Sequence, residues 1–323
     1  MSLRSRRLRV VPIVASIALL AAGFGDVSAA SLPSSDRGSA GPAPAAVGWV
    51  ATRIGKPART EVRDAAGTLL AELTDGARTV TLAGPARSWT EAGFATDIST
   101  DRWVRLLPAP YDGIFDAADT AWVAAALGNR SPDILAVAFQ YVSGAPSLSQ
   151  AGLVIAGDAQ YGVAAGADFN DFLGVAWSYG LRIDAPEPAE LRSLDCSGFV
   201  RMVLGYRFGM TMSIGASAGA LPRRAPDQLA SGPGRLMVAN SGRQLTSYNN
   251  LRAGDLAFFD ASTVDGTAID HVGIYVGRDA QGHHRFISSR RMADGPTVGD
   301  IGGASVLDGS GYWALAFRAV RRP

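Results

Sequence analysis

Hydrophobic and polar positions alternate in the first part of the chain and take on helical spacing further along. The region from Val47 to about Pro108 is mostly strand-like, with short alternating runs bounded by turn residues. Four segments are the clearest: strands at 77–82 and 103–107, and helices at 119–127 and 133–141. No cluster of Asp, Glu, His or Ser in this region indicates a site. We therefore interpret residues 47–160 as a mixed, partly β accessory region of unknown role.

The second half of the chain shows helical patterns followed by strand patterns. Asp168 begins a predicted helix that runs to about Trp177, and Asp195 caps a second helix whose apolar residues recur at helical spacing. Four strands are predicted after them, at 256–259, 271–277, 285–289 and 312–320. Helices first and antiparallel strands afterwards favour an α+β fold over a doubly wound α/β sheet.

The N-terminus has the pattern of a secretory signal peptide. A basic segment at Arg4–Arg9 precedes the apolar run Val10–Phe24, and small residues allow cleavage before Ala30. The apolar run is about 15 residues long, which is short of the roughly 20 that a membrane-spanning helix needs. We expect export, removal of residues 1–29, a flexible leader at 30–46, and no stable membrane anchor afterwards.

Charge and length narrow the functional classes. Removing residues 1–29 changes 30 basic and 29 acidic residues to 26 and 28, a net charge of −2. Such a chain offers no global electrostatic attraction for nucleic acid. The remaining chain of about 290 residues is long enough for one large domain or two ordinary ones.

Cys196 is the only cysteine, so no intramolecular disulfide can form. A lone cysteine is most often a small buried hydrophobe. Here it follows the N-cap residue Asp195, which places the sulfur in the first turn of the predicted helix. The free N–H groups and the helix dipole at that position favour the thiolate, which is the nucleophilic form.

A cysteine nucleophile needs a base, and the chain has three histidines. His271 begins an alternating strand, whereas His283 and His284 follow a turn and are expected to face solvent. If the hairpin loop is centred between 279 and 280, His271 lies opposite Ser288 and Tyr275 lies opposite His284. Ser288 could then orient the imidazole. One cysteine and three histidines at these spacings match no zinc site, so no metal is expected.

Three motifs closely resemble the signatures of the NlpC-type cell-wall peptidases, which are papain-like cysteine peptidases of bacterial peptidoglycan. They are Asp195-Cys196-Ser197-Gly198-Phe199-Val200, Leu251-Arg252-Ala253-Gly254-Asp255-Leu256-Ala257-Phe258-Phe259 and His271-Val272-Gly273-Ile274-Tyr275-Val276-Gly277. Residues 222–228 are similar to the short segment with Arg and Gln that this family has between nucleophile and sheet. The resemblance covers roughly residues 165–323 and leaves residues 47–160 uncovered.

The resemblance implies helices packed on an antiparallel sheet, and amide hydrolysis by Cys196 with His271 as base. Its third catalytic position, commonly His, falls on Ser288. It implies no metal or organic cofactor. The implied partner is the peptidoglycan stem peptide, often cut between γ-D-glutamate and a diamino acid, and the implied location is the bacterial cell envelope or the medium.

The expected substrate contacts are four residues near the nucleophile: Trp177, Tyr179, Asp195 and Ser197. The family usually has Tyr before Trp, and this chain has the inverse order, so ordinary core packing is an equal alternative for both aromatics. Two other functions stay open. One is a Cys–His amidase or acyltransferase acting on another envelope molecule, and the other is a catalytically weak envelope-binding or scaffold protein.

Overall fold

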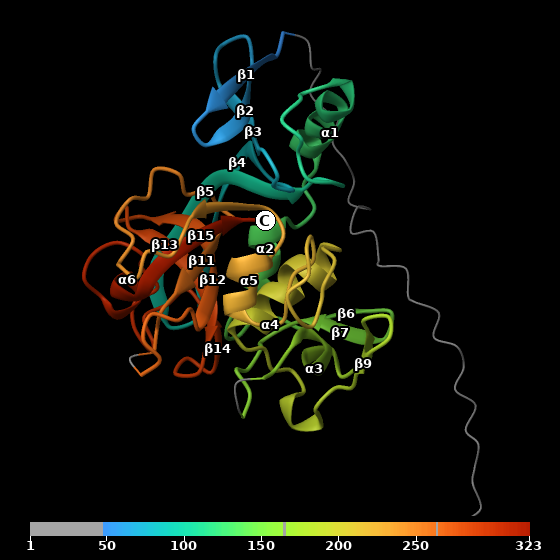
Figure 1. The fold of residues 1–323 in the computed structure, drawn as a ribbon, viewed down its shortest axis with the longest axis vertical. Helices are drawn as coiled ribbons and strands as arrows, with labels where there is room; N and C mark the ends of the chain where they lie inside the picture. The colour runs from blue at the N-terminus through green and yellow to red at the C-terminus, as the bar shows by residue number, and fades with distance from the viewer. Residues whose placement is uncertain (1–47, 164–165, 263) are drawn as a thin grey trace, which may run out of the picture. The chain divides into compact units, whose positions relative to one another are not determined.

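The computed structural model describes residues 48–163, 166–262 and 264–323 (Figure 1). The predicted signal peptide and leader fall within residues 1–47 and so lie outside the described residues. Within the described part of the chain, no helix is long and apolar enough to cross a membrane.

Five antiparallel strands form the first part of the fold, in the region that the alternation predicts to be mostly strand-like. They are β1 (Val50–Gly55), β2 (Ala58–Arg63), β3 (Leu69–Thr74), β4 (Thr79–Glu91) and β5 (Phe94–Leu106). The two short alternating runs are parts of the long strands β4 and β5. Alternate residues such as Val62, Leu73 and Leu82 are buried in a small core shared with the helix that follows.

Both predicted helices of this region are present and begin at aspartate caps. In α1 (Ala117–Gly128), Asp116 and Asp119 form a reciprocal capping box. In α2 (Ile134–Ala138), the side chain of Asp133 accepts a hydrogen bond from the Ala136 amide, and a 3₁₀ turn (Phe139–Tyr141) extends the helix. A two-stranded ribbon of β6 (Leu148–Gln150) and β7 (Leu153–Ala156) comes next.

Short helices position the segment that contains the cysteine. They are α3 (Phe169–Leu173), α4 (Cys196–Val200) with a π-helical continuation (Arg201–Arg207), and α5 (Ala225–Ser231). Asp168 caps α3 as predicted, but the helix ends before Trp177 because Gly174 adopts a left-handed conformation with φ 68°. Between α3 and α4 lie β8 (Trp177–Ser178), β9 (Ile183–Asp184) and a 3₁₀ turn (Pro188–Glu190).

The remaining strands extend one antiparallel sheet. They are β10 (Arg235–Val238), β11 (Leu256–Phe259), β12 (His271–Asp279), β13 (His284–Arg290), β14 (Gly295–Thr297) and β15 (Phe317–Arg322). The strand order is β1-β2-β3-β4-β5-β12-β11-β15-β10, with β13 pairing to β12 and β14. The predicted strand at 312–320 is wrong over its first half. Residues Tyr312–Ala316 form helix α6, which buries Trp313 and Ala316 on one face.

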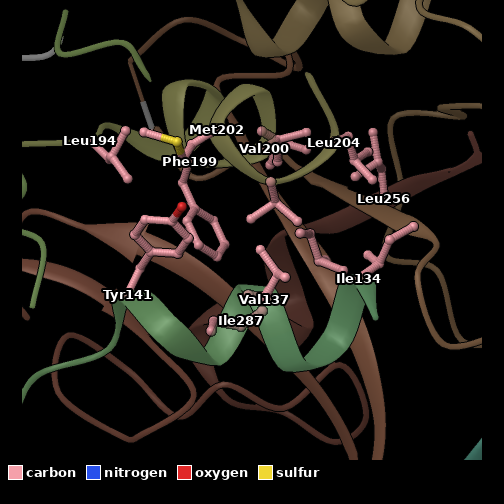
Figure 2. Packing of buried hydrophobic residues seen from close by; sticks show 14 of the residues in the cluster. Ile134, Val137, Tyr141, Leu194, Phe199, Val200, Met202, Leu204, Leu256 and Ile287 are labelled. Carbon is pink, nitrogen blue, oxygen red and sulfur yellow. The ribbon is translucent and has the colours of Figure 1, made fainter. Parts of the chain in front are cut away.

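One core joins α2 to the helix that carries the cysteine. Figure 2 shows Ile134 and Val137 of α2, together with Tyr141, facing Phe199 and Val200 of α4. The Tyr141 and Phe199 rings meet edge to face, with 6.1 Å between their centroids. Residues on both sides of 160–165 therefore share this core. Helices and antiparallel strands together give an α+β fold, as predicted.

Candidate active site

Asp195 fixes the turn that begins α4, in the manner the sequence predicts. Its carboxylate accepts a hydrogen bond of 2.7 Å from the Gly198 amide and one of 3.1 Å from the Ser197 hydroxyl. The Asp195 amide donates in turn to the carbonyl oxygen of Ala167 at 2.9 Å. Cys196 is therefore the first residue of the helix, with its backbone N–H free of the helical ladder.

Two arginines form ion pairs with the aspartates next to this turn. Arg223 pairs with Asp195 at 2.7 Å and donates to the Ser197 hydroxyl at 2.8 Å. Arg201 is fully buried and contacts both carboxylate oxygens of Asp168 at 3.0 Å. Burial lowers the pKa of Arg223, but the charges of Asp195 and Asp168 outweigh it and leave the pKa above its ordinary value. Fixed ion pairs thus position the nucleophile turn.

The Cys196 thiol lies against the start of β12. It is 8% exposed, and Sγ donates to the carbonyl oxygen of Asp270, the residue before His271, at 4.0 Å. Burial raises the pKa of the thiol to about 12, and the negative charge of Asp195 adds to the rise. The expectation of a resting thiolate is therefore wrong, because desolvation and the adjacent carboxylate outweigh the helix start.

His271 sits in an aromatic pocket at the first position of β12. Its ring centroid is 4.5 Å from that of Trp313 and 5.8 Å from that of Phe259. Within the described residues, its buried Nε2 atom has no hydrogen-bond partner. Burial lowers the pKa of His271 to about 3, and the positive charge of Arg290 contributes. The imidazole is thus neutral, the form that can accept a proton.

The β12–β13 register differs from the predicted one by two residues. Tyr275 pairs with Phe286 rather than with His284, and Ile274 pairs with Ile287. The turn is longer than assumed because Asp279 accepts hydrogen bonds from the amides of residues 281 and 283, and a bulge follows Tyr275.

Ser288 consequently lies beside Gly273. A Cβ added at Gly273 would come 3.0 Å from the Cβ of Ser288. The Ser288 hydroxyl accepts a hydrogen bond from Arg290 Nε at 3.1 Å.

The two remaining histidines differ in their surroundings. His283 is exposed, as predicted, and pairs with Asp308 at 2.7 Å, which raises the pKa of His283. Burial alone would raise the pKa of the Asp308 carboxyl, but its hydrogen bonds from His283 and the His284 amide lower it. His284 is buried, contrary to prediction. Its Nδ1 is 2.7 Å from the Tyr275 hydroxyl, its ring stacks on Tyr248, and burial lowers its pKa. His284 is the first residue of β13, where it pairs with Arg278, and its ring is covered by Tyr248 and Tyr275.

The aromatics ahead of the nucleophile separate into two roles. Trp177 and Tyr179 are both partly buried against the core, and Trp177 packs edge to face on Phe169 with ring centroids 5.0 Å apart. Tyr179 lines a cleft of about 600 Å³ together with Cys196, Asp195 and Ser197. Its hydroxyl is hydrogen-bonded to Arg201. We call this space the nucleophile cleft.

A second space lies on the histidine side. This pocket of about 410 Å³, which we call the Arg290 pocket, has a lining that includes Tyr161, His271, Arg290, Arg291, Tyr312 and Trp313. Tyr161 lines the nucleophile cleft as well. Sequence reasoning did not single out Tyr161, Arg290 or Trp313, because none of them lies in a motif. No group of three or more potential metal ligands occurs among the described residues.

Comparison with known proteins agrees with the resemblance. Residues 174–297, which contain Cys196, His271 and Ser288, match the model of the NlpC/P60 family. Members of this family are generally cysteine peptidases or amidases that act on peptidoglycan, so the match suggests a cell-wall hydrolase-like function. No curated protein gives a significant match to the chain.

Three solved structures are similar over part of their length. One is a protein of the NLP/P60 family, described as similar to a lipoprotein, from Staphylococcus aureus subsp. aureus Mu50 (20% identity, TM-score 0.29). The match covers 67% of this chain and half of that one. NlpC1 from Trichomonas vaginalis follows (14% identity, TM-score 0.31, 85% of this chain and 77% of that one). An NlpC/P60 family protein from Bacillus cereus ATCC 10987 is the third (15% identity, TM-score 0.27, 84% and 78%).

Proposed function

We propose that this protein is a secreted peptidoglycan endopeptidase that hydrolyses the stem peptide, at the bond from γ-D-glutamate to the diamino acid. One observation carries the proposal. The segment that matches the family holds the cysteine at the start of a helix, with Sγ 4.0 Å from the carbonyl oxygen of the residue before His271. We also propose that residues 1–29 are removed on export. Residues 47–160 serve as an accessory region, and its helix α2 supports the core.

In the proposed reaction, Cys196 Sγ attacks the scissile carbonyl carbon and the thiol proton passes to His271. The backbone N–H of Cys196 donates to the oxyanion that forms. The amine then leaves with the proton from His271, and water hydrolyses the thioester to release the new carboxylate and the free thiol. No cofactor takes part in these steps.

The resting protonation states shape this mechanism. The thiol has a pKa of about 12 and the imidazole one of about 3, so a thiolate–imidazolium pair is strongly disfavoured before substrate binds. Proton transfer must therefore accompany attack, with the neutral imidazole acting as general base. Asp195 and Arg223 contribute by holding the turn, because their ion pair fixes the position of the cysteine.

Mass spectrometry of soluble products tests the proposal. The full chain and a Cys196→Ala variant are each incubated with purified peptidoglycan and with defined muropeptides. We expect new fragments only with the unaltered protein, with masses that identify the bond. Identical product spectra from both proteins would exclude hydrolysis of these substrates by Cys196.

The raised thiol pKa also favours a second candidate, a catalytically weak envelope-binding or scaffold protein. Thiol labelling separates the two. A scaffold leaves Cys196 less reactive than a model thiol, and muropeptide does not change the labelling rate, whereas in an enzyme the bound muropeptide covers Sγ and slows its labelling.

A further inference from the structure

Among residues 48–163, 166–262 and 264–323, no carboxylate forms an ion pair with the buried cation Arg290. It is 3% exposed on strand β13, and burial lowers its pKa to about 9, so it remains charged at neutral pH. Its guanidinium lies over the rings of Trp313 and Phe286, 4.7 and 4.9 Å from their centroids. Buried charges in proteins are normally paired, because desolvating an isolated one is costly.

The hydrogen bonds of Arg290 all go to neutral oxygens. It donates to the Ser288 hydroxyl at 3.1 Å, the Gly303 carbonyl at 2.7 Å and the Ser305 hydroxyl at 2.5 Å. A guanidinium has five N–H groups. Three of them are therefore used, and none of them meets a carboxylate of the described residues.

The two acids whose charges act on Arg290 are occupied elsewhere. Glu91 accepts hydrogen bonds from the Thr297 hydroxyl at 2.9 Å and the Val298 amide at 2.8 Å. Asp300 pairs with Arg285 at 3.1 Å. Both of these acids therefore leave the guanidinium without a direct ion pair.

The position of this cation connects it to the candidate chemistry. Arg290 and His271 line the same pocket, and the buried Nε2 atom of His271 has no partner among the described residues. Tyr161 lines both this pocket and the nucleophile cleft. A peptide with its scissile carbonyl at Cys196 could thus place a neighbouring group beside Arg290.

We infer that the Arg290 pocket binds a carboxylate of the substrate, held by the guanidinium next to His271, and that Arg290 selects acidic stem peptides over amidated ones. The inference deepens the proposed function and rests on it. A planar carboxylate suits a guanidinium better than any neutral group, because it can accept parallel N–H bonds and compensate the charge. The bound carboxylate also neutralises the positive charge that disfavours a protonated His271.

Two carboxylates of the stem peptide could fill the pocket: the free one of glutamate and the one on the side chain of diaminopimelate. Three synthetic peptides separate them. In all three peptides the C-terminal α-carboxyl of diaminopimelate is amidated, so only the two carboxylates in question vary. The first is L-Ala-γ-D-Glu-meso-diaminopimelate with both of these carboxylates free, the second has the glutamate carboxylate amidated, and the third has the side-chain carboxylate of diaminopimelate amidated. We measure kcat and KM for each peptide, and binding of each to the Cys196→Ala variant by calorimetry.

The unaltered protein should prefer the first peptide over one of the other two by roughly ten- to hundredfold in kcat/KM, as expected for a charge-assisted hydrogen bond. The amidation that lowers kcat/KM identifies the substrate carboxylate that the pocket binds. In Arg290→Gln the preference should fall to near one, and in Arg290→Lys it should be intermediate. Arg278→Gln is the matched control, because Arg278 is an exposed arginine of the same hairpin that lines neither space.

Equal kcat/KM for all three peptides with the unaltered protein would overturn the inference, whether or not the Arg290 variants fold. Undiminished discrimination in folded Arg290→Gln would overturn it as well. Binding to Cys196→Ala that depends on the carboxylate, without any cleavage by the unaltered protein, would overturn the proposed function and leave the carboxylate pocket supported. The two failures are therefore distinguishable.

Discussion

Gly198→Ala tests how closely the nucleophile turn packs against the segment before α3. A Cβ built on Gly198 would lie 2.3 Å from the carbonyl oxygen of Ala167 and 3.0 Å from the Cα of Asp168. Both are backbone atoms, so no side chain can rotate away. Restoring an ordinary contact requires the two segments to separate by about 1 Å, and overpacking of this kind typically costs about 1–3 kcal/mol.

The same shift would disturb the site. Ala167 accepts the hydrogen bond from the Asp195 amide, so the added methyl group pushes against the bond that holds the turn before the cysteine. A displacement of about 1 Å in the reacting geometry can reduce turnover roughly a hundredfold. We expect urea unfolding to show the loss of stability and muropeptide hydrolysis to show the loss of kcat/KM.

Gly215→Ala is the matched control, since a Cβ at Gly215 would meet nothing within 4 Å. It should change neither quantity measurably. If Gly198→Ala were as stable and as active as Gly215→Ala, the close approach of the two backbones would not constrain the turn, and this reasoning would be refuted.

Three other predictions concern protonation, buried charge and the shared core. Because the folded pKa of His271 is lowered to about 3, its basic form persists on acidification, and kcat/KM should stay level from pH 7 to 5; a fall centred near 6.5 would contradict this. Arg201→Met leaves Asp168 buried without its nearest cation and should cost about 3–5 kcal/mol in urea unfolding, while a loss below about 1 kcal/mol would show that the pair is not needed. Leu135→Ala removes a fully buried side chain of α2 and should cost about 2–5 kcal/mol while speeding thiol labelling of Cys196; unchanged labelling at lower stability would mean that α2 does not support the nucleophile helix.

Helix starts and several strands followed directly from the sequence. Asp168 and Asp195 cap α3 and α4 as predicted, because capping depends on one side chain and the amides within three residues of it. The strand at 256–259 matches β11 over its full length, since a short apolar run flanked by turn residues is a local signal.

Other features depended on distant contacts. The residues of α6 are also compatible with a strand. In the structure they form a helix, and Trp313 on this helix packs against the rings of Phe259 and His271. The β12–β13 register depends on the length of the turn, which is set by the hydrogen bonds that the Asp279 carboxylate accepts. The alternation of hydrophobic and polar residues does not specify that length. That register decided that Ser288 lies beside Gly273.

The reactive groups follow from the order of residues alone: a lone cysteine after a capping aspartate, a strand that begins with histidine, and the motifs in the segment that matches the family. The electrostatic state of these groups depends on the packed fold. The thiol is protonated because the fold buries it beside Asp195, and the imidazole is neutral because the fold buries it beside Arg290. Desolvation and Coulomb interactions depend on distances in space, and these follow from packing between segments far apart in the chain.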